Sequence, residues 1–133
     1  MKPVINMSNK NEHLNMIQGV INRLANNSLQ LKCWTIAITT AFIALANGWV
    51  ISIALIPIAI FCIMDAKYLS TERSFRGLFN NVRKREESEI DYSMNFKPFE
   101  EKITKSIFSW SVAPFYIVLA ITVIIVTILR AVN

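Results

Sequence analysis

The chain has 133 residues, of which 53% are hydrophobic, and its 14 Lys/Arg and 9 Asp/Glu give a net charge of +5. This length limits it to one domain. Acids and bases nearly cancel between Met64 and Trp110, and basic residues are not interleaved with aromatic ones, so we expect no nucleic-acid partner. A single histidine without clustered Cys or carboxylate ligands gives no metal signature. No nucleophile–base pair is visible, so we expect no enzyme, no catalytic residue and no cofactor.

The first predicted element is an amphipathic cytoplasmic helix over residues 9–31. Asn9 is the expected N-cap, and Glu12 completes a variant of the capping box. We expect the neighbouring His13 to be solvated or to take part in capping. One narrow stripe of the helix is apolar, with members at spacings of three and four: Leu14, Ile17, Ile21, Leu24 and Leu31, with Ser28 between them.

That stripe has two interpretations: the helix lies on the membrane surface, or it packs against another helix. A surface helix usually carries more Lys/Arg and bulkier apolar residues. Between His13 and Leu31 the only basic residue is Arg23. We therefore favour packing against protein, with the other cytoplasmic helix as the expected neighbour.

Residues 33–64 are predicted to form a helical hairpin in the membrane. Its apolar arms, 33–46 and 49–64, are separated only by Asn47 and Gly48, which both tolerate positive φ and indicate a turn. As one helix these residues would extend ~48 Å, which is too long for a ~30 Å hydrocarbon core. Each arm is somewhat short of a full crossing, so a shallow re-entrant hairpin is the alternative.

Residues 65–109 are predicted to be cytoplasmic helices joined by a loop. The second arm is expected to continue as one straight helix to about Arg85. Residues 88–98 read as a loop, because Asp, Asn and Pro break the periodicity there. Residues 99–109 are then predicted to form a short helix that leads into the next span.

Charged residues gather where the second arm leaves the membrane: Asp65, Lys67, Glu72, Arg73 and Arg76. An ionisable residue deep in a membrane is a functional candidate. Asp65 lies at the boundary beside Lys67, which favours a structural interfacial role. Glu72 and Arg76 have the i,i+4 spacing of a helical ion pair.

Residues 110–130 form the third predicted span, which is uncharged before Arg130. Pro114 either kinks this span or marks its true start. Three spans place every basic residue except Arg130 on one side, including Lys2 near the N-terminus. Because positive loops stay inside, we expect a cytoplasmic N-terminus and an outer C-terminus. The spans contain no Asp, Glu, Lys or His, which argues against a proton relay or a substrate transporter.

Ala37, Ala41 and Ala44 form a stripe of small residues on the first span. Such stripes let helices approach closely. The stripe serves either to pack the three spans of one chain together or to join copies of the chain. One chain has too few spans to enclose a pore, so a water-filled path would need a homo-oligomer.

Residues 13–34, HLNMIQGVINRLANNSLQLKCW, resemble the N-terminal signature of a family of small, uncharacterised bacterial inner-membrane proteins. The resemblance continues at 65–83, DAKYLSTERSFRGLFNNVR, and weakly at 91–95, DYSMN. It implies a bacterial inner-membrane protein, in which the outer C-terminus expected from the charges would be periplasmic. The layout is similar to that of the membrane effectors of anti-phage defence systems, which is an analogy of architecture.

The sequence thus predicts an all-α integral membrane protein, with a hairpin, one further span and cytoplasmic amphipathic helices. Our first functional hypothesis is an effector that oligomerises in the lipid bilayer and perturbs it. The alternative is a scaffold or regulatory subunit, which anchors a cytoplasmic protein partner through the stripe of the N-terminal helix. Neither hypothesis needs a metal or a cofactor.

Overall fold

The computed structural model describes residues 8–132, and all regular structure in this range is helical, as predicted. Lys2 lies outside the described residues. The elements follow in the order α1 (Asn9–Leu45), η1 (Gly48–Ala54), α2 (Leu55–Lys84), η2 (Glu87–Glu89), η3 (Lys97–Phe99), α3 (Ile103–Ile107) and α4 (Ala113–Val132). Three helical stretches are long and apolar enough to cross a membrane, namely α1, η1 with α2, and α4.

The helix α1 joins two elements that the sequence analysis treated separately, the amphipathic helix and the first arm of the hairpin. It runs for 37 residues, or ~55 Å at 1.5 Å per residue. No proline lies within it, so nothing forces a break where the apolar segment begins. Its N-cap is Ser8, whose side chain accepts a hydrogen bond from the Asn11 amide. The prediction of Asn9 as N-cap is therefore wrong by one residue.

The hairpin turn lies at Asn47 and Gly48, as predicted. Gly48 has φ of 57°, the only positive φ among the described residues, and this left-handed conformation favours glycine. The chain then continues as the 3₁₀ helix η1 and becomes α-helical at Leu55. Pro57 explains this boundary: it has no N–H to donate to the Ile53 carbonyl, so the α-helical ladder cannot extend back into η1.

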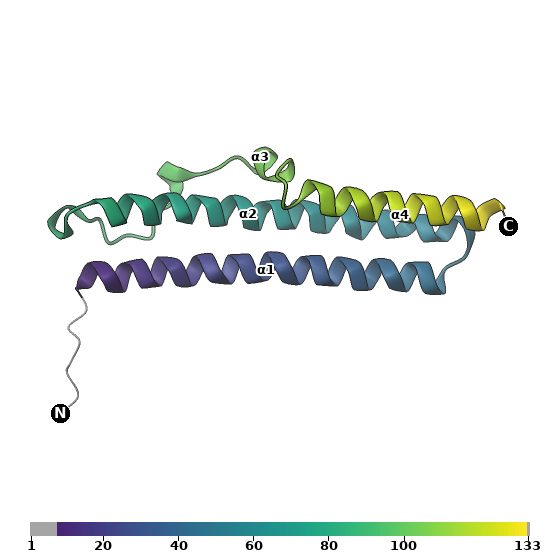
Figure 1. The fold of residues 1–133 in the computed structure, drawn as a ribbon, viewed down its shortest axis with the longest axis horizontal. Helices are drawn as coiled ribbons and strands as arrows, with labels where there is room; N and C mark the ends of the chain where they lie inside the picture. The colour runs from purple at the N-terminus through teal and green to yellow at the C-terminus, as the bar shows by residue number, and fades with distance from the viewer. Residues whose placement is uncertain (1–7, 133) are drawn as a thin grey trace, which may run out of the picture.

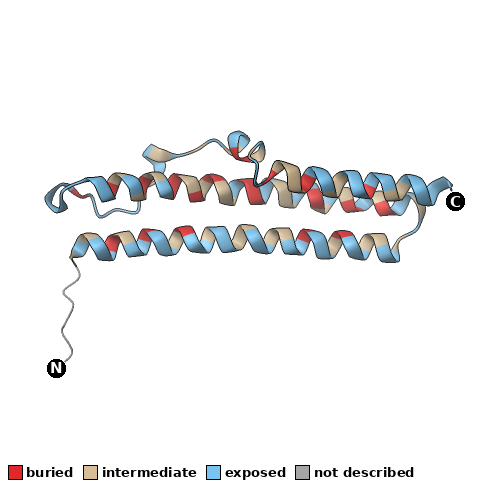
Figure 2. Cartoon of the chain, in the orientation of Figure 1, coloured by how far each residue is buried: buried red, intermediate tan, exposed pale blue. Residues whose placement is uncertain are grey.

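Figure 1 shows α1 and α2 lying antiparallel and side by side, with α4 against the end of the pair that contains η1. The chain after α2 folds back along the opposite end. We call these ends the apolar half (residues 33–64 and 110–132) and the polar half (8–32 and 65–109). In Figure 2, buried residues follow one stripe along each long helix, and the remaining faces are exposed.

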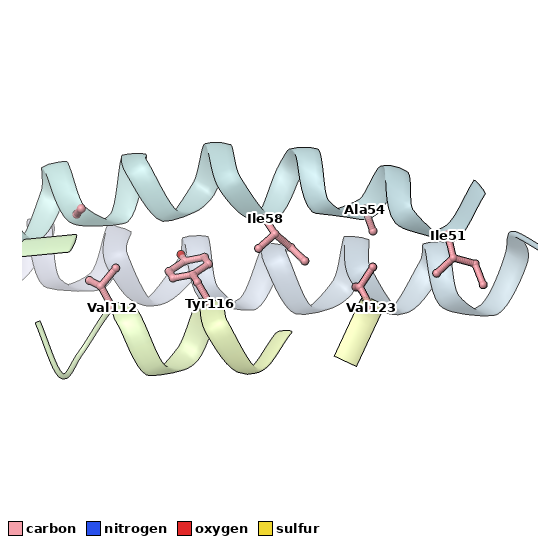
Figure 3. Packing of buried hydrophobic residues seen from close by; sticks show 7 residues of the cluster. Ile51, Ala54, Ile58, Val112, Tyr116 and Val123 are labelled. Atoms are coloured by element: carbon pink, nitrogen blue, oxygen red, sulfur yellow. The ribbon is translucent and has the colours of Figure 1, made fainter. Parts of the chain in front are cut away.

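Each half has its own hydrophobic core. In the polar half, Ile17 and Ile21 of α1 pack with Phe75, Leu78 and Val82 of α2. The core of the apolar half contains Ile51, Ala54, Ile58, Val112, Tyr116 and Val123, and it extends to Ala66, just inside the polar half. Figure 3 shows the α4 members of this second core facing those of η1 and α2. At the far end of α4, Arg130 donates a hydrogen bond to the Ala46 carbonyl at 3.1 Å, which ties α4 to the end of α1.

The segment after α2 is fixed on α2 by close contacts although it is largely irregular. The Phe96 ring lies 4.8 Å from the Phe75 ring, centroid to centroid. A Cβ on Gly77 would lie 2.8 Å from the Cβ of Phe99, so only glycine permits this approach. The predicted helix over 99–109 is wrong at both ends, since α3 covers only Ile103–Ile107. Pro114 marks the start of α4, at its second residue.

Candidate functional site

The apolar stripe of α1 is occupied within the chain. Ile17 is fully buried and Ile21 is 3% exposed. Leu14 and Leu24 are half-buried against the same core. Leu31 is also half-buried, at the end of the stripe. The partner of this helix is thus α2 of the same chain, and little of the stripe is left for another protein.

His13 is 1% exposed, so the expectation of a solvated or capping histidine is wrong. Its ring packs edge-on against Tyr92 at a centroid distance of 5.4 Å, and its Nε2 has no hydrogen-bond partner among the described residues. Beside it, the Lys10 ammonium donates to the Arg85 carbonyl at 2.6 Å. These contacts attach the start of α1 to the chain that follows α2.

A polar cluster lies between α1 and α2 where the two halves meet. Asp65 of α2 is fully buried and accepts hydrogen bonds from the Ser28 hydroxyl and from the Lys32 ammonium, the latter at 2.5 Å. The Lys32 ammonium also donates to the Ser28 hydroxyl at 3.1 Å. We call Ser28, Lys32 and Asp65 the junction cluster. Lys67, the neighbour that the sequence suggested for Asp65, is exposed, because two residues turn ~200° around a helix.

All three long helices meet at the junction cluster. Thr35 follows Lys32 on the same face of α1, and its hydroxyl donates to the Leu31 carbonyl at 2.7 Å. From α4, the Tyr116 hydroxyl lies near Asp65 and Thr35 but makes no hydrogen bond of standard geometry. The Lys32 ammonium is 6.0 Å from the centroid of the Phe115 ring. A buried carboxylate is tolerated only when it is paired, so this cluster fixes the register of α1 against α2.

Three other charged residues predicted at this boundary form ion pairs within the polar half: Glu72, Arg73 and Arg76. Glu72 is buried and pairs with Arg76 at 2.7 Å, the i,i+4 pair that the spacing suggests. Arg73 pairs with Glu101 of the returning segment at 2.6 Å. The first pair lies within α2, and only the second joins α2 to the segment that returns along it.

The small-residue stripe of the first predicted span lies on α1 and faces away from the rest of the chain. Ala37, Ala41 and Ala44 are all exposed, and Thr40 extends the same surface. We call these four residues the outward face. The side of α1 that packs inside the chain instead carries Thr35 and Thr39, which are 1% and 2% exposed. The alanines therefore do not pack the three spans of one chain together, and a shallow apolar hollow lies beside them, lined by Ala41, Phe42, Leu45, Ala46 and Val50.

Three members of these sites were not predicted as site residues from the sequence: Ser28, Lys32 and Thr40. Ser28 interrupts an otherwise apolar stripe, and Lys32 follows it by four residues on the same side of the helix. That pattern of polar residues on a buried face is the one signal that indicated a polar partner on another helix. No signal identified Asp65 as that partner.

Within residues 8–132 no group of His, Cys, Asp and Glu could hold a metal ion. Comparison with protein-family models, with curated proteins and with solved structures finds no match for this chain. The function is therefore argued from two features of its geometry, the buried junction cluster and the exposed outward face.

Proposed function

We propose that this chain is an integral membrane protein of the bacterial inner membrane, with a cytoplasmic N-terminus and a periplasmic C-terminus. The length of α4, 20 residues or ~30 Å, matches the hydrocarbon core. Only 11% of the most apolar window of α1, and the same share in α4, is buried within the chain, so a further apolar environment has to cover them. Basic residues lie almost entirely in the polar half, which favours its cytoplasmic placement.

We further propose that copies of the chain associate in the bilayer and perturb it, as a membrane effector. The observation that carries this proposal is the exposure of the outward face, Ala37, Thr40, Ala41 and Ala44. Lipid tails are as apolar as leucine side chains, so association between spans depends on close packing and on interhelical hydrogen bonds. Small side chains allow such packing, and the Thr40 hydroxyl supplies a polar group.

The alternative function, a scaffold that holds a soluble partner through the α1 stripe, has less support. The residues that would bind the partner, Ile17 and Ile21, are already buried against α2. A partner could reach them only by displacing α2, which would expose Phe75, Leu78 and Val82. The polar half is instead closed around its own hydrophobic core. The junction cluster connects it to the apolar half.

A role in anti-phage defence is part of the proposal and rests on the resemblance in layout described above. In such a role the polar half would receive the trigger. The apolar half would then perturb the bilayer, as a homo-oligomer.

The test is the variant Ala41→Leu. Residue 41 is exposed, so leucine can be accommodated in the single chain but separates two α1 helices that meet there. We expect the oligomer in detergent to dissociate at least about tenfold more readily, equivalent to ~1.4 kcal/mol, and dye leakage from vesicles to fall with it. Ala25→Leu, an exposed alanine of α1 in the polar half, is the matched control and should leave both readouts unchanged. A wild-type protein that is monomeric and leaves vesicles intact would refute the effector proposal.

A further inference from the structure

A second surface of the apolar half is hollowed, between α2 and α4 and below the end of α3. This lateral groove has a volume of about 420 Å³. Its wall is almost entirely apolar and includes Ala59, Cys62, Phe108, Tyr116, Ile117 and Ala120. It lies away from the outward face of α1, which the proposed self-association uses.

The groove is open because small side chains line it where two helices pass each other. Ala59 of α2 and Ala113 and Ala120 of α4 leave the space unfilled. Phe108, which is 83% exposed, forms a wall at the end nearest the polar half. The groove is therefore an unfilled apolar hollow that opens on the side of the molecule.

The groove extends over about two thirds of one leaflet of a bilayer. Along α2 it runs from Leu55 to Cys62, which is ~10 Å at 1.5 Å per residue. One leaflet contributes ~15 Å to a hydrocarbon core of ~30 Å. The end with Ile107 and Phe108 adjoins the polar half, so in the proposed orientation the groove belongs to the inner, cytoplasmic leaflet.

Basic residues lie close in the chain to the residues at that end of the groove. Lys105 lies in the last turn of α3, one turn before Phe108, Lys102 is the N-cap residue of α3, and Lys67 follows Cys62 on α2. All three lysines are exposed, and none of them forms an ion pair within residues 8–132. Of the nearby acids, Asp65 and Glu101 are already paired, and Glu100 is exposed. The chain beside this end of the groove therefore carries an excess of positive charge.

We propose that the lateral groove binds one phospholipid of the inner leaflet, with an acyl chain along Ala59 and Ala120 and an anionic headgroup at Lys102 and Lys105. The inference rests on the proposed membrane insertion. Basic pockets between spans on the cytoplasmic side are the places where anionic lipid headgroups bind. Two features favour this occupant over a neutral lipid: an apolar channel within one leaflet, and basic residues beside its cytoplasmic end in the chain. Because Tyr116 lines the groove and also lies near Asp65, the bound lipid would contact the junction cluster through one side chain.

The experiment measures lipids that stay bound after purification. Wild-type protein is reconstituted in nanodiscs of mixed phosphatidylglycerol and phosphatidylcholine, extracted in mild detergent and examined by native mass spectrometry. We expect one retained phosphatidylglycerol per chain. Ala59→Phe and Ala120→Phe each fill the groove and should lose the lipid whatever its headgroup. The control Ala25→Phe, on the exposed side of α1 in the polar half, should retain it.

The headgroup is tested separately with Lys102→Gln combined with Lys105→Gln. This variant should keep a lipid but lose the preference for phosphatidylglycerol by about 30-fold, equivalent to ~2 kcal/mol. Lys84→Gln, at the far end of α2, is the matched control. A protein that inserts in nanodiscs yet retains no lipid would overturn this inference and leave the proposed function standing. A loss of dimers in Ala59→Phe without any retained lipid in the wild type would also overturn it, in favour of a second chain as the occupant. Failure of the wild type to withstand alkaline extraction from membranes would instead refute membrane insertion, and this inference with it.

Discussion

The junction cluster is tested most directly by replacing Lys32, the positively charged partner of Asp65. In Lys32→Met the stem of the side chain remains, but the carboxylate of Asp65, at 0% exposure, loses the ammonium that lies 2.5 Å away. Breaking one side of a buried ion pair costs ~3–5 kcal/mol, because the remaining charge is buried without compensation. The Ser28 hydroxyl still donates to Asp65, which places our expectation at the lower end, ~3 kcal/mol.

The assay is reversible unfolding in mixed micelles, with the free energy of unfolding compared between the wild type, Lys32→Met and a double variant. The double variant Lys32→Met with Asp65→Leu removes both charges, and apolar replacement of a buried pair is often neutral or stabilising. We therefore expect the single variant to be the least stable and the double variant to recover most of the loss. Equal stability of Lys32→Met and the wild type would show that Asp65 is solvated, and would refute the buried junction cluster.

Three further outcomes follow from particular contacts. Ile21→Asp places a charge in the core between α1 and α2 and should cost ~2–4 kcal/mol, measured by the same unfolding assay; an unchanged free energy of unfolding would show that the stripe is not packed. Gly77→Ala forces Phe99 away and should cost ~1–3 kcal/mol and increase proteolysis of the returning segment, whereas Gly19→Ala, which meets nothing within 4 Å, should not. A reporter that is active only in the cytoplasm, fused after Asn133, should be silent, and a bright signal there would contradict the proposed topology.

Local chemistry made much of the backbone predictable from the sequence. Asn47 and Gly48 specify the turn because glycine adopts the positive φ that is found there. Pro114 marks the start of α4, which is one of the two alternatives that the sequence left open, since its missing N–H is tolerated in a first turn. The long continuation of α2 was expected to about Arg85, and the helix ends at Lys84. Each of these predictions depends on residues adjacent to one another in the chain.

Contacts between residues that lie far apart in the chain could not be predicted from the sequence. The partner of Asp65 is Lys32, 33 residues away, and only the register of α1 against α2 brings them together. His13 is buried because the chain near Tyr92 folds back over it, and no periodicity reports the path of an irregular segment. The sequence also did not indicate whether the side of α1 with Ala37, Ala41 and Ala44 faces into the chain or away from it. Thr35 and Thr39 on the other side are also small, so hydrophobicity does not distinguish the inner from the outer side of such a helix.

Disulfide cross-linking in native membranes tests the central claim, association through the outward face, most directly. The background carries Cys33→Ala and Cys62→Ala, because Cys33 is itself exposed on α1. A disulfide forms only when two Cα atoms approach to about 4.4–6.8 Å. We predict that Ala41→Cys gives a covalent dimer on mild oxidation, whereas Val118→Cys, 62% exposed on α4, does not. Equal cross-linking at the two positions, or none at residue 41, would contradict the account.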